Sequence, residues 1–140
     1  MDNGSNVIGN VYRILIVDDN KHIIKSLELS LKFTEFSFAC EIYVADNGIK
    51  ALKLIERERI HLVFTDYEMP NMNGYNLMRA IKEFNESIRV VLISGFPREN
   101  VRDEFDGCIE KGFRDFYKLI IDEVNKQAAD YFAEKVESIL

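Results

Sequence analysis

The chain has 140 residues, 47% of them hydrophobic, and its 24 acidic and 18 basic residues give a formal net charge of −6. This length and composition predict one soluble globular domain, and the negative charge argues against direct nucleic-acid binding by it. No apolar run approaches the ~18 residues of a membrane span, and the polar start lacks the features of a signal peptide, so we expect no membrane association and a cytoplasmic location.

Apolar runs alternate with amphipathic segments through the first two thirds of the chain. We expect a flexible lead-in over residues 1 to 11 and a domain over residues 12 to 140. Four predicted strands are the runs Arg13 to Val17, Phe38 to Ala45, Leu62 to its end at Asp66, and Arg89 to Ile93. The helices between them are predicted over Lys21 to Thr34, from the turn at Asp46 to near Glu58, and around Leu77, Met78 and Ile81.

The last third of the chain is expected to continue the alternation. Three apolar residues at a spacing of four predict a helix over residues 98 to 111: Val101, Phe105 and Ile109. The segment Phe113 to Tyr117 then predicts a short fifth strand that Lys118 closes, and an amphipathic helix runs from Ile121 nearly to Leu140. Five strand-helix units with right-handed crossovers predict an α/β fold with a doubly wound parallel sheet.

Two acidic residues, Asp18 and Asp19, directly follow the first predicted strand. Adjacent carboxylates repel each other, so a positive partner should compensate them, and a divalent cation with oxygen ligands is the simplest candidate. The alternative is that Asp19 or Asn20 only caps the next helix.

Other strands also end in polar residues. Asp66 stands where the third strand stops, and Ser94 follows the fourth, where its hydroxyl can donate to an anion or simply start a turn. Because the carboxyl ends of parallel strands lie along one edge of such a sheet, we expect these residues to meet. This set of groups suits phosphoryl transfer. Two carboxylates can hold Mg²⁺, a lysine can neutralise phosphoryl oxygens, and a third carboxylate, that of Asp66, can attack phosphorus as the nucleophile.

Several segments resemble the receiver domain of two-component response regulators. They are ILIVDDN (14 to 20), ADNGIKAL (45 to 52), VFTDYEMPNMNGYNLM (63 to 78), VVLISG (90 to 95) and Lys118. The resemblance covers roughly residues 12 to 132. It implies a flavodoxin-like five-stranded parallel sheet in the order 2-1-3-4-5, with five helices.

The resemblance also implies roles for individual residues. Asp66 is similar to the phosphoacceptor, Asp18 and Asp19 to the acidic Mg²⁺ pair, and Glu68 to the residue whose backbone carbonyl binds that ion. Ser94 matches the switch hydroxyl and Lys118 the basic residue that pairs with the phosphate. A signalling switch rather than a conventional enzyme is implied, which catalyses only its own phosphorylation and dephosphorylation.

The implied partners follow from that role. The phosphoryl group would come from the phosphohistidine of a sensor histidine kinase or a phosphotransfer protein. The readout would pass through residues 94 to 124 to an effector that the sequence does not identify, and an exposed part of that region could form a homodimer.

The end of the chain departs from the family pattern. Between Gly112 and Lys118 it is one residue short, and Leu119 stands where the family usually has a proline, so a cis peptide is not expected there. Lys111 is therefore the alternative to Lys118. The shortening also leaves open whether Phe116 or Tyr117 takes the family's aromatic switch position, while most aromatic residues of this region are expected in the core.

Two other function classes fit parts of the pattern. A haloacid-dehalogenase-like phosphatase also uses a strand-end aspartate and Mg²⁺, but it carries two aspartates at a spacing of two on its first strand. A non-phosphorylated interaction module on the same fold is the other alternative. Cys40 and Cys108 are expected to be reduced thiols, and His22 and His61 form no recognisable motif.

Overall fold

The computed structural model describes residues 11–95, 99–112 and 114–140. Five parallel strands form one sheet in the order β2-β1-β3-β4-β5, which confirms the predicted fold. The strands are β1 (Val11–Val17), β2 (Ala39–Ala45), β3 (Leu62–Thr65), β4 (Arg89–Ser94) and β5 (Gly107–Glu110). The helices are α1 (Lys21–Lys32), α2 (Gly48–Arg57), α3 (Gly74–Phe84), α4 (Glu99–Arg102) and α5 (Phe116–Ile139).

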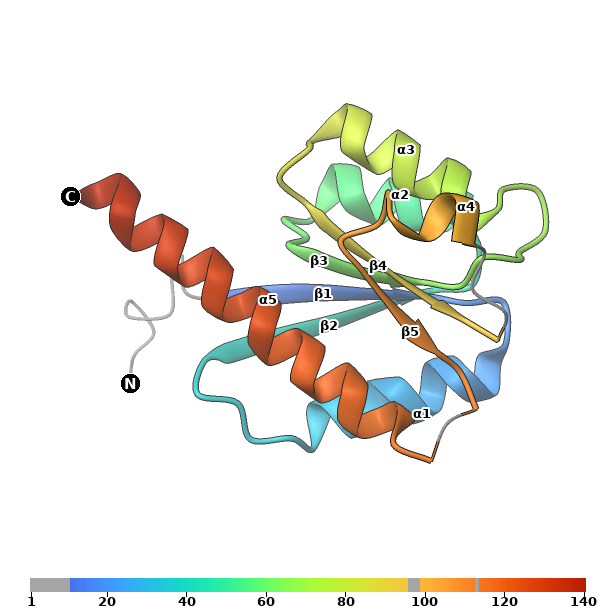
Figure 1. The fold of residues 1–140 in the computed structure, drawn as a ribbon, viewed down its shortest axis with the longest axis horizontal. Helices are drawn as coiled ribbons and strands as arrows, with labels where there is room; N and C mark the ends of the chain where they lie inside the picture. The colour runs from blue at the N-terminus through green and yellow to red at the C-terminus, as the bar shows by residue number, and fades with distance from the viewer. Residues whose placement is uncertain (1–10, 96–98, 113) are drawn as a thin grey trace.

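The sheet lies between two helical layers. α1 and α5 cover one face, and α2, α3 and α4 cover the other (Figure 1). Each face has its own apolar cluster, with Leu27, Phe64 and Val124 in one and Leu15, Ala51 and Leu77 in the other. Since the central strands are buried on both faces, their sequences are continuous apolar runs rather than alternating ones, which is why the sequence could predict them.

Asparagine side chains cap the first three helices. Asn20 accepts hydrogen bonds from the backbone N–H groups of His22 and Ile23, and Asn47 and Asn73 cap α2 and α3 in the same way. The cap of α1 is therefore Asn20, and the carboxylate of Asp19 is not used for that purpose.

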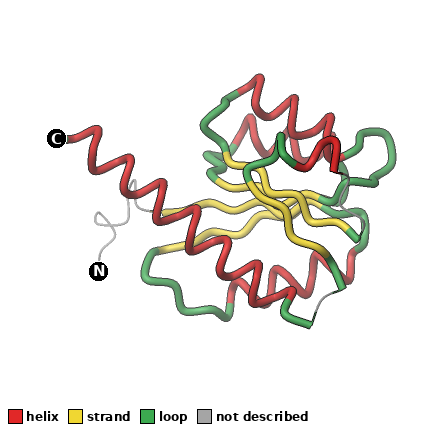
Figure 2. The backbone as a smooth tube through the Cα atoms, in the orientation of Figure 1, coloured by secondary structure: helices red, strands yellow, loops and turns green. Residues whose placement is uncertain are grey.

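The first four strands and α1 to α3 are confirmed, with boundary shifts of one to a few residues. β1 begins at Val11, and the rest of the expected lead-in lies outside the described residues. Figure 2 shows how these strands alternate with the helices along the chain.

The prediction for residues 98 to 111 was wrong. α4 ends at Arg102, and β5 occupies Gly107–Glu110. Val101 and Phe105 pack on one face of the sheet, whereas Ile109 belongs to the cluster on the opposite face. The three residues with a spacing of four therefore belong to α4, to the loop after it and to β5, and residue 98 itself lies outside the described part.

The predicted strand Phe113 to Tyr117 was also wrong. Phe116 and Tyr117 form the first turn of α5, which therefore starts before the predicted Ile121. Neither residue lies on β5: Phe116 is buried in the core, whereas Tyr117 is 41% exposed. Residue 113 lies outside the described residues. Within the described segments, no helix combines the length and the apolar character needed to cross a membrane.

Candidate functional site

Asp66 directly follows β3, at the carboxyl edge of the sheet. Its backbone N–H donates to Val17 O at 2.9 Å, which continues the parallel pairing one residue beyond the strand. Its carboxylate Oδ1 accepts from the backbone N–H of Tyr67 at 2.9 Å, and its side chain is 13% exposed. The backbone amide of Tyr67 thus orients the Asp66 carboxylate, which remains partly accessible to solvent.

Asp18 and Asp19 lie beside Asp66, as expected. Each of the three residues offers one carboxylate oxygen, and these three oxygens lie within 4.8 Å of one another. The Asp18 side chain is completely buried and accepts the backbone N–H of Asn20 at 2.9 Å, whereas Asp19 is exposed. The three carboxylates could therefore share one cation, with Asp19 on the solvent side.

The lysine at this site is Lys111. The prediction that Lys118 lies here was wrong. Lys111 follows β5, and its Nζ lies 2.6 Å from Asp18 Oδ2 and 3.2 Å from Asp66 Oδ1. Lys118 is on α5, where it forms an exposed ion pair with Asp122 four residues later. The short β5 was misread as helix, which moved the expected strand end by seven residues; the turn at Gly112 (φ 89°) after Lys111 was the available signal.

Ser94 is the last residue of β4 and is 6% exposed. Its backbone carbonyl accepts the backbone N–H of Lys111 at 2.9 Å, so the ends of β4 and β5 are tied together. Glu68 lies in the loop after Asp66 and its side chain is exposed. Their roles as switch hydroxyl and as carbonyl ligand stay predictions.

The loop after Asp66 is held by close backbone packing. Gly74 N–H donates to Tyr67 O at 2.7 Å, and a Cβ added at Gly74 would lie only 2.1 Å from Asp66 O. A glycine is required there because any side chain would push the backbone of Asp66 away. Asn71, with φ 70°, supplies the turn between them.

Negative charge at the site is only partly compensated. Burial and the neighbouring Asp18 raise the pKa of Asp66, although Lys111 and the Tyr67 amide oppose the shift. Burial alone would lower the pKa of Lys111, but Asp18 and Asp66 outweigh it and raise that pKa. Among the described residues, three carboxylates against one ammonium leave an excess of negative charge. Carboxylate oxygens are the ligands that Mg²⁺ prefers, so these residues fit this ion.

The fold and this cluster of charged side chains define a class of protein, a doubly wound α/β domain with three carboxylates and a lysine at the strand ends. The family model of the response regulator receiver domain matches residues 14–120. The chain belongs to this family.

Known response regulators are similar to this chain in sequence and in structure. The two-component response regulator ARR6 of Arabidopsis thaliana is 32% identical over 114 residues, which cover 74% of this chain and 59% of the relative. A two-component transcriptional regulator AraC from Clostridium phytofermentans ISDg has a TM-score of 0.76 at 25% identity, over 90% of this chain and 98% of that one. The response regulator TrrA of Thermotoga maritima has a TM-score of 0.70 at 26% identity, over 83% and 98%.

The first curated relatives are longer than the matched region. Between 47% and 60% of the length of three Arabidopsis regulators is matched by this chain. The shared segment is therefore the receiver domain. Membership in that family also rules out the haloacid-dehalogenase-like alternative.

Proposed function

We propose that this receiver domain is a Mg²⁺-dependent switch in which Asp66 accepts a phosphoryl group from the phosphohistidine of a histidine kinase or phosphotransfer protein. One observation carries the proposal: Asp18, Asp19 and Asp66 offer oxygens within 4.8 Å of one another, and the Lys111 ammonium contacts Asp66. The related regulator from Thermotoga maritima was solved in complex with Mg²⁺-BeF, which supports the same chemistry here.

Each residue has a defined part in the transfer. An oxygen of Asp66 forms the bond to phosphorus while the P–N bond of phosphohistidine breaks, and its electron pair stays on the imidazole nitrogen, which takes up a proton. Bound Mg²⁺ would neutralise phosphoryl oxygens, held by Asp18, Asp19, Asp66 and the backbone carbonyl of Glu68. The Lys111 ammonium provides further positive charge on the side of Asp66.

The switch follows from the added charge. The acyl phosphate carries about −1.5 to −2 charge units in place of the single negative charge of the carboxylate, and its three acceptor oxygens attract the Ser94 hydroxyl and the Lys111 ammonium. Because Lys111 N–H is bonded to Ser94 O, movement at one strand end is transmitted to the other. We therefore assign the readout toward an effector to the region 94–124, which contains α4, β5 and the start of α5.

The decisive experiment is the intact mass of the protein after incubation with acetyl phosphate and Mg²⁺. One added phosphoryl group is expected for the native protein and none for Asp66→Asn. An unlabelled native protein would instead support the non-phosphorylated interaction module. Equal labelling of the variant would exclude Asp66 as the acceptor.

A pair of lysine variants tests the assignment of the basic residue. Lys111→Gln should slow labelling by about tenfold or more, because it removes the only ammonium that the described residues place on Asp66. Lys118→Gln should change the rate by less than about twofold, since its exposed ion pair with Asp122 is remote from the site. The opposite result would restore Lys118.

Magnesium binding can be measured without a phosphodonor. Millimolar Mg²⁺ should raise the melting temperature of the native protein, because an ion that binds only the folded state stabilises it. Asp19→Asn should weaken this response while it leaves the buried Asp18–Lys111 pair in place. An unchanged response would remove Asp19 from the ligand set.

A further inference from the structure

A cavity lies at the opposite end of the sheet from Asp66. It has a volume of about 310 Å³, in the range of small-molecule sites, and is formed by the starts of β1, β3 and β4 together with the distal half of α5. Its α5 wall includes Tyr131 and Lys135, which lie beyond the segment 14–120 that matches the receiver family. The receiver chemistry at Asp66 makes no use of this cavity.

Flat aromatic rings form part of the lining. Tyr12 and His61 stack with an interplanar angle of 8°, and Tyr131 contacts His61 with ring centroids 4.5 Å apart. His61 Nδ1 accepts the backbone N–H of Arg13, so the neutral ring carries its proton on Nε2. Burial lowers the pKa of His61 to about 4, and the ring therefore stays uncharged near neutral pH.

The Tyr12 hydroxyl is an unpaired polar group beside this cavity. Tyr12 is fully buried and lines the cavity, and its Oη has no hydrogen-bond partner in the described part of the chain. An unsatisfied buried hydroxyl is unfavourable, so such a group indicates that a further polar atom belongs near it.

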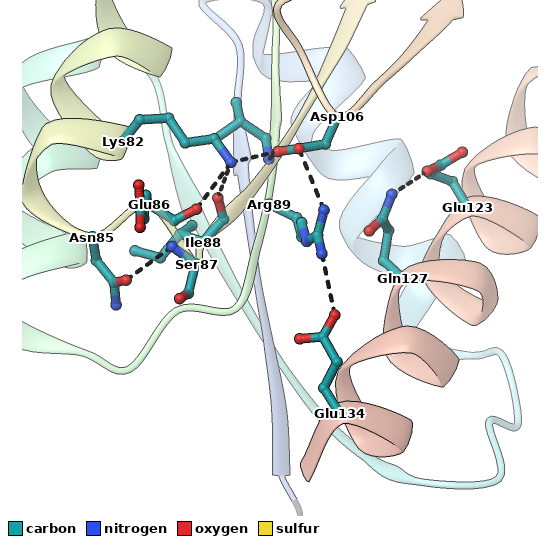
Figure 3. A network of polar contacts seen from close by, with 11 residues as sticks. Lys82, Asn85, Glu86, Ser87, Ile88, Arg89, Asp106, Glu123, Gln127 and Glu134 are labelled. Atoms are coloured by element: carbon teal, nitrogen blue, oxygen red, sulfur yellow. Dashed lines mark hydrogen bonds and ion pairs between the residues drawn. The ribbon is translucent and has the colours of Figure 1, made fainter. Parts of the chain in front are cut away.

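Two cationic side chains and one anionic side chain line the cavity, although the whole chain is acidic. The charged residues there are Arg89, Lys135 and Glu134. Arg89 lies between Asp106 and Glu134 (Figure 3), at 3.5 and 3.4 Å, longer than tight charge-assisted hydrogen bonds of about 2.7–2.9 Å. Contacts with the described residues therefore do not use all of its five donors, and the 66% exposed Glu134 can move away from it into water.

We propose that this cavity binds a small planar aromatic anion, with its ring against the partly exposed rings of His61 and Tyr131 and its anionic group toward Arg89 and Lys135. The apolar side chains of Ile60 and Ile88 complete the surface for the ring. The neutral Nε2–H of His61 offers a further donor to the ligand. Binding is independent of phosphorylation at Asp66.

Titration of the full chain with 2-naphthoate, without phosphodonor, tests the proposal by amide chemical shifts. Shifts should centre on His61, Ser87 and Tyr131, and the neutral isostere 2-naphthamide should bind at least about fivefold more weakly. Equal affinity for the two probes would overturn the anionic assignment. Shifts elsewhere, or none with either probe, would overturn the site itself.

Two matched pairs of variants separate binding from folding. Ser87→Trp places a bulky ring at the exposed edge of the cavity and should abolish binding, whereas Ser37→Trp, at an exposed position that does not line it, should not. Lys135→Gln should weaken 2-naphthoate binding by about threefold or more and leave 2-naphthamide unchanged. Lys126→Gln, on the same helix but outside this cavity, should affect neither, and equal effects of both lysine variants would count against the proposal.

Discussion

At the carboxyl edge of the sheet, Asp18 and Asp66 share one ammonium, that of Lys111. At the amino edge, by contrast, several positive or hydrogen-bond-donating groups surround a single carboxylate. Asp106 accepts from Lys82 Nζ at 2.7 Å and from Val90 N–H at 2.8 Å, and Arg89 lies 3.5 Å away (Figure 3).

The comparison distinguishes a reactive cluster from a structural one. Lys82 also donates to Ile88 O at 2.6 Å, so the amino-edge network joins α3, the start of β4 and the residue before β5. Its carboxylate is fully paired, and we expect it to stabilise the fold. The carboxyl edge retains surplus negative charge, which costs stability but prepares the site for a cation and a phosphoryl group.

The largest effect on stability is expected from Gly74→Ala. The new Cβ would lie 2.1 Å from Asp66 O, a backbone atom that cannot turn aside, and we expect a loss of about 2–4 kcal/mol in the free energy of unfolding. Denaturant titration measures it. Gly95→Ala is the control, because nothing lies within 4 Å of its added Cβ, and equal losses in both variants would contradict the close packing of this loop.

Asp106→Asn should lower the unfolding free energy by about 2–3 kcal/mol, because Lys82 and Arg89 lose the carboxylate that they share. Asp103→Asn, at an exposed position nearby, should change it by less than about 0.5 kcal/mol. A result for Asp106→Asn as small as that of the control would show that the amino edge does not depend on this network.

His61 should make stability depend on pH. Its pKa is lowered in the folded state to about 4, first by burial and then by Arg13, Lys135 and Arg59. Below pH 6.5 the unfolded chain therefore binds more protons, and stability should fall by about 1–3 kcal/mol between pH 6.5 and pH 4.

The variant His61→Asn, whose side-chain oxygen can still accept the Arg13 N–H, should reduce the slope in this pH window. Denaturant titrations at several pH values measure it, with His22→Gln as the control for loss of a histidine outside the cavity. An identical slope in the native protein and His61→Asn would refute the assignment.

The smallest expected effect is a gain in stability from a substitution at the carboxyl edge of the sheet. The raised pKa of Asp66 means that its contribution to stability is favourable at low pH and is lost as pH rises through the folded pKa. Asp66→Asn keeps an acceptor for the Tyr67 N–H, and in metal-free buffer at pH 7 it should stabilise the protein by on the order of 1 kcal/mol. Thermal unfolding with and without Mg²⁺ would measure this, and a destabilised variant would show that the charge at Asp66 is well compensated.

Sequence reasoning worked where one local pattern has one cause. β4 is apolar from Val90 to Ile93 because both faces of the sheet are covered, and polar residues that follow such a run lie at a sheet edge. Asp18, Asp19, Asp66 and Ser94 could therefore be found from the printed chain alone, although their chemical roles still await the experiments above.

Contacts between distant segments determined the rest. Val101, Phe105 and Ile109 have helical spacing, but they pack on opposite faces of the sheet, so the periodicity hid β5, and the tertiary packing decided between Lys111 and Lys118. The amino-edge cavity likewise needs α5 to lie against the starts of β1, β3 and β4. The periodicity of a sequence reports which residues of a single helix or strand are buried. The position of a lysine between two strand ends, or of aromatic rings from three elements around one cavity, depends instead on how those elements pack together.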